Sequence, residues 1–385
     1  MKKLLQLILL VALIAALAVV VGFRARPAAV PASGGAAVQT DAPPAPSSAP
    51  VSEPEPTKPP EPEFFTISVI GDQTLTTNQY REGSPYSYAA RMNGDYAYPF
   101  SNTVQYFEND DFTISNLECT LADIKLYSAE QFYFRAPTDY ANILTEGGVD
   151  FVTTANNHML DFGQTGLDFT WQALEEHGIP YGKEDEAQIV TTDSGLRIGV
   201  YCAYNDFQPD KDKAAAAIRQ LRADGAEYVI CAYHWGKELY YEPNASQTEI
   251  GRAAIDAGAD LVYGSHTHCL QPIEEYNGGI ILYSMGNWSF GGHTAPSDRD
   301  TAIVQVTVKR DADGSVSNEG YTAIPCCVSS RPVREGYIGD NYNDYCPTPY
   351  TEGSDAYLRT LSKLDGSYKP DKQGRDYSDV YASYG

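Results

Sequence analysis

The sequence predicts a mixed α/β domain behind an N-terminal transmembrane helix, and three observations lead to this prediction. Strand-like apolar runs alternate with helical stretches through the middle of the 385-residue chain. Five of the strand-like runs end in Asp, Glu, Asn or His. The chain also begins with two lysines and a long apolar run.

The first element is a predicted signal anchor over residues 1–24. Its apolar run from Leu4 to Phe23, interrupted only by Gln6, has about the 20 residues that cross a bilayer and exceeds the core of a cleaved signal peptide. The two leading lysines favour a cytoplasmic N-terminus, although Arg24 and Arg26 weaken that orientation. We therefore expect a single-pass protein of the cell membrane with an extracellular globular domain.

Three further segments follow the anchor. Residues 25–63 are rich in Pro, Ala, Ser, Gly and Glu, and this composition predicts a disordered tether. Residues 64–330 contain no second low-complexity break and are predicted to form one domain. Residues 331–385 form a Tyr-rich extension with one helical candidate, "SDAYLRTLSKL", and either cover the domain or stay partly disordered.

Charge and cysteine content exclude some classes of protein. The formal net charge of −24 argues against nucleic acid as a partner, because like charges repel. The seven cysteines form no C-x-x-C pair and no dense framework, so neither a disulfide scaffold nor a zinc ribbon is expected. An extracellular setting would permit one bridge from the Cys326 and Cys327 pair to Cys346.

The five polar strand ends are the main functional signal. The strand-like runs deliver, in chain order, Asp72; Asn116 and Glu118; Asn157 and His158; His234; and His266 and His268. The helical stretches "QTGLDFTWQALEEHG", "KAAAAIRQLRADG" and "ASQTEIGRAAIDAGA" alternate with them. Because α/β sheets bind ligands beyond the carboxyl ends of their strands, these side chains are expected to converge.

The residue types at these ends suit a divalent metal. Imidazole nitrogen mixed with carboxylate and amide oxygen fits Mn, Fe or Zn, and the lack of thiolate disfavours a structural zinc site. Residues two apart on a strand share a face. If "HTH" is extended, His266 and His268 therefore point to one side and serve one or two ions.

Several of these stretches together resemble a known family. They are "GD" at 71–72, "NLE" at 116–118, "ANNHMLDFGQTGL" at 155–167, "HWGKEL" at 234–239, "GSHTHCLQPIE" at 264–274 and "ILYSMGNWSF" at 281–290. In this order they resemble the capsule-synthesis protein CapA family, also called the PgsA or poly-γ-glutamate biosynthesis family. That family belongs to the calcineurin-like metallophosphoesterase superfamily. The resemblance implies a four-layer α/β/β/α sandwich with a two-metal site at its edge.

The resemblance also implies a role for each strand-end residue. Asp72 and His268 would bind the first metal, Glu118 would bridge, Asn157, His234 and His266 would bind the second metal, and His158 would be the catalytic histidine. Two departures stand out. Thr74 occupies the place of an imidazole ligand, and Glu118 replaces the usual Asp, so the site would hold metal more weakly or hold one ion only.

Further candidates surround this set. Asp161 is expected to orient His158, or to cap the helix that follows it, and the two roles are compatible. Possible substrate contacts are Asn116, Glu238, Asn287 and Trp288. The aromatic residues Trp235, Tyr240, Tyr241 and Trp288 either form walls for an organic substrate or pack the edge of the sandwich.

Two functions remain open on the sequence alone. The first is a membrane-anchored, extracellular, metal-dependent hydrolase that cleaves phosphoesters or an amide bond of a cell-envelope or capsule polymer; the family resemblance points to polyglutamate. The second is a non-catalytic assembly or export factor that works with other capsule synthesis subunits. The absent imidazole at Thr74 favours the second function, and the complete second-metal set favours the first.

Overall fold

The computed structural model describes residues 61–204, 210–334 and 342–370. The described residues belong to one compact unit. The predicted anchor and nearly all of the predicted tether lie outside the described residues. In the part of the chain that is described, no helix is both long and apolar enough to cross a membrane.

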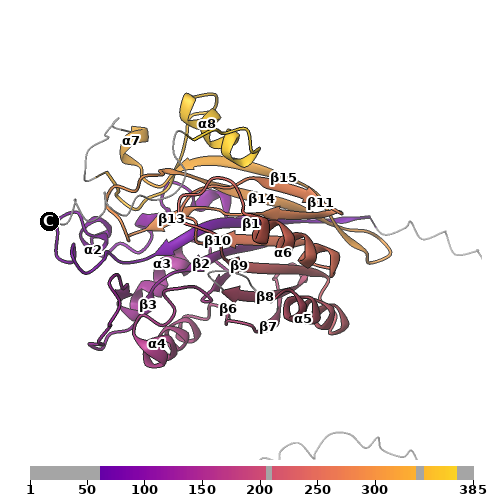
Figure 1. The fold of residues 1–385 in the computed structure, drawn as a ribbon, viewed down its shortest axis with the longest axis horizontal. Helices are drawn as coiled ribbons and strands as arrows, with labels where there is room; N and C mark the ends of the chain where they lie inside the picture. Colours follow the sequence, from indigo (N-terminus) through magenta and orange to yellow (C-terminus); the bar gives the residue numbers. More distant parts are fainter. Residues whose placement is uncertain (1–60, 205–209, 335–341, 371–385) are drawn as a thin grey trace, which may run out of the picture. The chain divides into compact units, whose positions relative to one another are not determined.

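The larger sheet carries three of the five predicted strand ends (Figure 1). Its strand order is β16-β15-β14-β1-β2-β5-β6, and β13 pairs with β1 off this path. The strands are β1 (Glu63–Thr74), β2 (Phe112–Leu117), β5 (Phe151–Thr153), β6 (Tyr181–Gly182), β13 (Asn287–Phe290), β14 (Asp300–Arg310), β15 (Val316–Cys327) and β16 (Thr348–Pro349). Strands β1, β2, β5 and β6 are parallel, so their carboxyl ends share one edge.

The second sheet carries the other two strand ends. Its order is β11-β12-β10-β9-β8-β7, and β8, β9, β10 and β12 run parallel. The strands are β7 (Ala187–Thr191), β8 (Arg197–Tyr204), β9 (Tyr228–His234), β10 (Leu261–Ser265), β11 (Ile273–Tyr276) and β12 (Gly279–Leu282). A separate two-stranded ribbon joins β3 (Thr120–Leu121) to β4 (Arg135–Ala136).

Helices flank the two sheets, and all the predicted helical stretches are confirmed. The helices are α2 (Tyr88–Met92), α3 (Ala141–Glu146), α4 (Gly163–Glu176), α5 (Lys211–Ala223), α6 (Ala245–Asp256), α7 (Arg331–Arg334) and α8 (Asp355–Leu364), with 3-10 turns η1 (Tyr98–Phe100), η2 (Val104–Tyr106) and η3 (Thr138–Tyr140). Asp210 caps α5 and Asn244 caps α6 through a capping box with Gln247. Such caps satisfy amides that a helix start leaves unpaired.

Three apolar cores separate the layers. The central core joins the facing sides of the two sheets, with Ile67 of β1 and Ile230 of β9 among its fully buried members. A second core lies between the larger sheet and a layer that includes α2, α3 and α4. A third lies between the smaller sheet and α5 and α6. The predicted α/β class is therefore confirmed, with helical segments outside two packed sheets (Figure 1).

Two glycines allow the loop before β13 to lie directly on the sheets. A Cβ atom at Gly71 would lie 2.2 Å from the carbonyl oxygen of Gly286, and one at Gly264 would lie 2.0 Å from that of Tyr283. Real side chains do not tolerate such contacts, so these positions require glycine. The close approach sets Asn287 beside Asp72 in the parallel pairing of β13 with β1.

The C-terminal extension is attached to β14 and β15 by α8 (Figure 1). Between α8 and the domain lies a group of charges that we call the C-terminal ion cluster: the buried residues Asp298, Asp300 and Lys363 and the more exposed Arg359, with Lys363 and Arg359 belonging to α8. The Lys363 Nζ atom lies 2.7 Å from a carboxylate oxygen of each aspartate, and Arg359 bonds to both oxygens of Asp300 at 2.7 and 2.6 Å. Of the two alternatives for the extension, the structure supports coverage of the domain over residues 342–370.

The seven cysteines are all buried thiols. The bridge that we considered from Cys326 or Cys327 to Cys346 is therefore wrong. Cys326 and Cys327 lie on β15, opposite Pro349 and Thr348 of β16. The Cys346 sulfur instead accepts a hydrogen bond from the side-chain amide of Asn102 at 3.1 Å.

Candidate metal centre

Asp72 occupies the carboxyl end of β1 and is completely buried. Its Oδ1 accepts a hydrogen bond from the Asn116 side chain at 2.9 Å, and its Oδ2 accepts one from the His266 amide at 3.2 Å. Burial raises the pKa of this carboxyl to about 6, and these two hydrogen bonds oppose the rise. Asp72 is thus held in a fixed orientation by two strand ends.

Glu118 follows β2 and is the least satisfied acid of the centre. Its side chain is fully buried, and neither carboxylate oxygen has a hydrogen-bond partner. The nearest imidazole nitrogens are Nε2 of His234 at 3.7 Å and Nε2 of His158 at 4.0 Å. Burial, followed by the charges of Asp72 and Glu238, raises the pKa of Glu118 well above its ordinary value.

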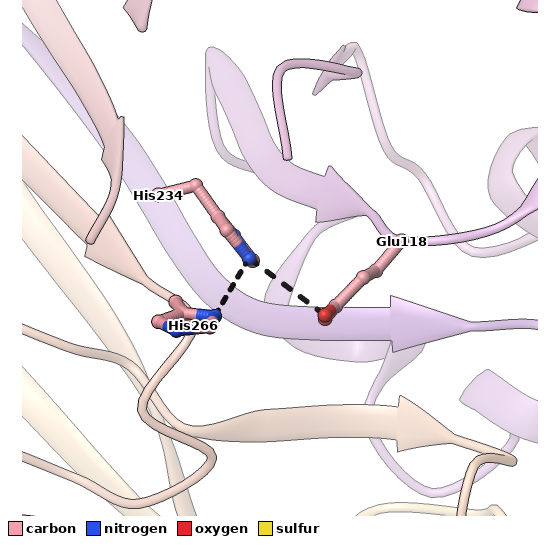
Figure 2. Close-up of side chains that lie close together, drawn as sticks. All are labelled: Glu118, His234 and His266. Atoms are coloured by element: carbon pink, nitrogen blue, oxygen red, sulfur yellow. Dashed lines mark hydrogen bonds and ion pairs between the residues drawn. The ribbon is translucent and has the colours of Figure 1, made fainter. Parts of the chain in front are cut away.

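His234, at the end of β9, lies between several possible ligands (Figure 2). Its Nε2 lies 2.8 Å from Oδ1 of Asn157 and 3.0 Å from Nδ1 of His266. Its Nδ1 lies 2.9 Å from the hydroxyl oxygen of Ser265. Burial and the neighbouring His266 keep the pKa of His234 well below its ordinary value, so the ring is neutral and offers a lone pair.

The "HTH" segment does not have the extended form that we considered. Strand β10 ends at Ser265, and His266 and His268 have φ angles of 90° and 53°. The backbone turns through the left-handed region at both residues, so the alternation of strand side chains does not apply. The two rings still lie on the same side of the site, with centroids 6.2 Å apart.

His268 is oriented by Asn287. Its Nδ1 lies 2.9 Å from Oδ1 of Asn287, whose side-chain nitrogen donates to the His268 carbonyl at 3.3 Å. The same Nδ1 lies 3.6 Å from Oδ2 of Asp72. Since Asn287 is 2% exposed, it serves to position His268 and has almost no surface for a substrate.

Two groups of side chains have the spacing of metal ligands, and they share Glu118. One consists of Glu118, His234 and His266, and the other of Asp72, Glu118 and His268; within each group the ligand atoms lie within 4.8 Å of one another. Nitrogen and oxygen donors in this mixture fit Mn, Fe or Zn. The buried Glu118 carboxylate without a hydrogen-bond partner also fits, because a cation beside it would stabilise its ionised form.

Thr74 stands where the resemblance expects an imidazole. It is completely buried, and its hydroxyl donates to the backbone carbonyl of Glu118 at 3.2 Å. This contact supports the segment that presents Glu118. The group around Asp72 consequently has one imidazole, whereas the group around His234 has two.

His158 and Asp161 form a pair beside the ligand groups. The His158 Nδ1 lies 3.0 Å from both carboxylate oxygens of Asp161, and the Phe134 amide donates to Asp161 at 2.8 Å. The alternative of a helix cap at Asp161 is wrong, because the cap residue of α4 is Phe162 and no side chain caps it. Asp161 therefore orients the histidine, whose Nε2 faces Glu118.

The remaining candidates for substrate contact differ in their exposure to solvent. Asn116 and Trp288 have no exposed surface, so the expected substrate contacts at these two residues are not available. Trp288 packs against Phe100 and Phe107, and Asn116 positions Asp72. Glu238 is half-buried and reaches the centre through its charge, which contributes to the raised pKa of Glu118.

The aromatic residues near β9 are mostly part of the packing. Trp235 is buried and stacks on Tyr233 at a ring distance of 4.7 Å. Tyr241 packs against Tyr368 of the C-terminal extension. Tyr240, 36% exposed, is the one of the four with substantial surface, so the alternative of edge packing holds for most of the group.

Sequence reasoning missed Asn156. Its side-chain amide donates to Oδ1 of Asn116 at 3.1 Å and to the Leu117 carbonyl at 2.8 Å, and its Oδ1 accepts from the His158 amide at 3.1 Å. It thereby ties the end of β2 to the loop that carries His158. The available signal was the doubled asparagine of "ANNH", of which only the second was assigned a role.

These features define an α/β protein with a candidate metal centre where the strands of two packed sheets end. Residues 66–291 match the model of the family described as bacterial capsule synthesis protein PGA_cap. The chain belongs to this family.

Curated relatives agree with this membership. The chain is 30% identical over 233 residues to the PGA biosynthesis protein CapA of Bacillus subtilis, covering 54% of this chain and 60% of the relative. It is 28% identical to the capsule biosynthesis protein CapA of Bacillus anthracis, covering 65% of each chain. It is 27% identical to a probable polyglutamine synthesis accessory protein of Mycobacterium tuberculosis, covering 64% of this chain and 76% of the relative. The match thus spans less than two thirds of the two Bacillus proteins.

Solved structures give a looser likeness. A hypothetical protein from Thermus thermophilus aligns with a TM-score of 0.44 at 15% identity, covering 68% of this chain and 98% of the other. The NAD nucleotidase of Haemophilus influenzae aligns with a TM-score of 0.40 at 13% identity, covering 84% and 67%.

Proposed function

We propose that this protein is a membrane-anchored, extracellular, metal-dependent hydrolase of the metallophosphoesterase type that acts on a capsule or cell-envelope polymer, with polyglutamate as the first candidate. The observation that carries the proposal is Glu118. A fully buried carboxylate without a hydrogen-bond partner is favoured in its ionised form only beside a cation, and Glu118 belongs to both groups of ligand atoms.

The ligand groups supply the chemistry of the proposal. Asp72, Glu118 and His268 would hold one divalent ion, and Glu118, Asn157, His234 and His266 the other. Two ions held there would supply Lewis-acid chemistry for the activation of water and for an in-line displacement. The hydrogen bonds to Asp72 and His234 hold these side chains in place before the ions bind.

His158 would transfer the proton. Its Nδ1 is held by Asp161 and its Nε2 faces the centre at 4.0 Å from Glu118. A histidine oriented in this way protonates a leaving group, a contribution of roughly 10²- to 10⁴-fold to the rate. The carboxylate of Asp161 fixes the orientation and the tautomer of the neutral imidazole.

Localisation and substrate class have separate support. The apolar run at the N-terminus supports an anchor with the domain outside the cell. The names of the two Bacillus relatives, a PGA biosynthesis protein and a capsule biosynthesis protein, support a capsule polymer and partner proteins that make or export it.

A non-catalytic role in assembly or export is the second candidate, and Thr74 favours it. The group around Asp72 has a single imidazole, and the Thr74 hydroxyl is already bonded to the Glu118 carbonyl. A centre that holds only one ion would serve as a rigid binding platform without turnover.

Metal content and hydrolysis measured on the same sample separate the two candidates. The full-length chain would be loaded with Mn²⁺, analysed for bound metal, and tested on phosphoesters and γ-glutamyl peptides beside the His268→Ala variant. Bound metal with turnover that is lost in the variant supports the hydrolase. Bound metal without turnover on any substrate favours the platform, and a folded protein that binds no metal contradicts both.

A further inference from the structure

We propose that a small pocket beside the metal centre, with Arg135 as its cation, binds a carboxylate group of the substrate polymer. This inference rests on the proposed function, because it assigns the substrate class of the same site. It concerns residues outside the ligand groups and outside the His158–Asp161 pair.

The pocket lies between three segments and has a volume of about 190 Å³. Its lining comprises residues that follow β1, residues at the start of α2, and residues of β4 and η3: Thr76, Thr77, Glu82, Gly83, Ser87, Ala89, Arg135, Pro137 and Tyr140. Pockets for whole drug-sized ligands begin at about 300 Å³. This one therefore suits a single substituent of a longer molecule.

The pocket adjoins the catalytic side of the centre through Phe134. Phe134 directly precedes Arg135; its amide donates to Asp161 at 2.8 Å and its ring lies 4.6 Å from that of His158. On the opposite wall, Thr76 lies two residues after Thr74 of β1. Phe134 therefore connects the His158–Asp161 pair to the strand that carries Arg135.

Arg135 is a half-buried cation without an ion pair among the residues that the structure describes. Its Nη1 donates to the Ala122 carbonyl at 2.9 Å, which fixes one edge of the guanidinium. The other edge suits a carboxylate that binds through two parallel hydrogen bonds. In a chain with a net charge of −24, acids are abundant. An arginine without a carboxylate partner therefore indicates a position that can bind an acidic ligand.

The acids near Arg135 leave its charge largely uncompensated. Hydrogen bonds from Thr138 are the main reason why the pKa of Asp123 is lowered, and Arg135 contributes least. Glu82 lines the pocket but is exposed to solvent, where water and salt screen its charge. The local positive charge of Arg135 accounts for how an acidic protein could accept an acidic polymer.

A binding experiment tests the pocket independently of turnover. The probes are a short γ-glutamyl peptide with free α-carboxylates and the same peptide with α-amides, titrated calorimetrically into the full-length chain and into its His268→Ala variant. We expect Arg135→Gln to weaken binding of the acidic peptide about 10- to 100-fold, because a charged hydrogen-bond pair is lost, and to leave the amide peptide nearly unchanged. Arg219→Gln, which removes an exposed arginine of α5, is the charge-matched control.

Two further variants keep the test decisive if Arg135→Gln does not fold. Arg135→Lys retains the charge but not the paired hydrogen bonds and should bind the acidic peptide more weakly than the wild-type chain does, with the amide peptide nearly unchanged. Glu82→Gln removes a like charge from the exposed rim and should strengthen binding of the acidic peptide by a few fold. Equal losses for both peptides, or no effect of the Arg135 variants on binding of the acidic peptide, overturn the proposal.

The outcome also separates this inference from the proposed hydrolase. Selective binding of the acidic peptide without any hydrolysis supports the proposed carboxylate pocket and contradicts the proposed hydrolase. Hydrolysis of the acidic peptide that does not change in the Arg135→Gln variant supports the proposed hydrolase and contradicts the proposed pocket.

Discussion

The metal centre and the C-terminal ion cluster each contain two buried carboxylates, but they satisfy these charges differently. In the C-terminal ion cluster, Lys363 lies 2.7 Å from both Asp298 and Asp300. In the metal centre, Asp72 and Glu118 are equally buried, and the groups around them are imidazoles and amides. No lysine or arginine pairs with either acid in the described part of the chain.

The difference separates a structural cluster from a functional one. Burial disfavours ionised carboxylates in both places. One cluster compensates this cost with cations of its own sequence and so fastens α8 to the domain. The other requires a cation from outside, and the protein should therefore respond to metal at the first cluster and ignore it at the second.

The largest expected effect belongs to Glu118→Gln. Metal binding should fall at both positions because they share this carboxylate, and hydrolysis should drop at least about 10³-fold, since metal ions contribute several kcal/mol to such reactions. The metal-free variant should instead be more stable than the wild type by about 1–3 kcal/mol at a pH where Glu118 is ionised, because a buried charge without a partner is removed. Metal analysis, rate assays and urea unfolding check the three effects.

Glu108→Gln is the matched control for this prediction, since Glu108 is exposed. Retention of full metal content by Glu118→Gln would show that the shared carboxylate is not a ligand, and the contrast between the two clusters would lose its basis.

Lys363→Met should lower the stability of the protein and leave metal binding unchanged. Two buried aspartates would lose their ammonium partner, and the free energy of unfolding should fall by about 3–5 kcal/mol. Metal content per folded molecule should not change. Chemical unfolding together with metal analysis tests this, with Lys125→Met at an exposed lysine as the control.

The third prediction concerns pH in the absence of metal. The pKa of Asp72 is about 6 in the folded protein and 3.8 ordinarily, so between these values the folded state binds the proton more tightly than the unfolded chain does. The stability contributed by this protonation is present below about pH 4 and is lost as the pH rises through 6, at a cost of about 3 kcal/mol. Urea unfolding of the metal-free protein from pH 4 to 7 measures the fall.

Two comparisons complete the pH test. Asp72→Asn should reduce the dependence, because one titrating group is gone, while Glu118, whose pKa is also raised, continues to contribute. Saturation with Mn²⁺ at pH 7 should restore the lost stability, since a cation compensates the ionised carboxylate. A wild-type curve that stays flat from pH 4 to 7 without metal would refute the assignment of an uncompensated charge to this centre.

The smallest effect is expected for Asp161→Asn. The variant keeps a hydrogen-bond partner for the Phe134 amide but loses the charge that holds His158, so hydrolysis should fall roughly 10- to 100-fold with metal content unchanged. Rate assays at several pH values and metal analysis check this. A simultaneous loss of metal would place Asp161 with the ligand groups instead of with the proton donor.

The strand ends were predictable because each depends on local sequence. Apolar β-branched runs stop at Asp72, Glu118 and His234, and parallel strands bring their carboxyl ends to one edge. The sequence therefore predicted which side chains gather. The assignment of each to a metal remains a prediction that rests on the family resemblance and on the spacing of the ligand atoms.

The contacts between segments were not predictable. Asn287 orients His268 across 19 residues, and Asn116 orients Asp72 across 44, so their roles depend on how β13 and β2 lie against β1. The left-handed turns at His266 and His268 also lie beyond local propensity, because histidine rarely adopts them without tertiary support. Sequence patterns suggested substrate contacts at positions that the structure fills with packing and hydrogen bonds.

The seven buried cysteines can report which parts of the folded structure open locally. A thiol reagent reaches a buried sulfur only when the surrounding segment separates from its neighbours. Cys269 lies one residue beyond His268, whereas Cys326 and Cys327 lie on β15 near the attached C-terminal extension. The rates at which reagent modifies these sites, with and without metal, would record which region opens first and how firmly each is closed.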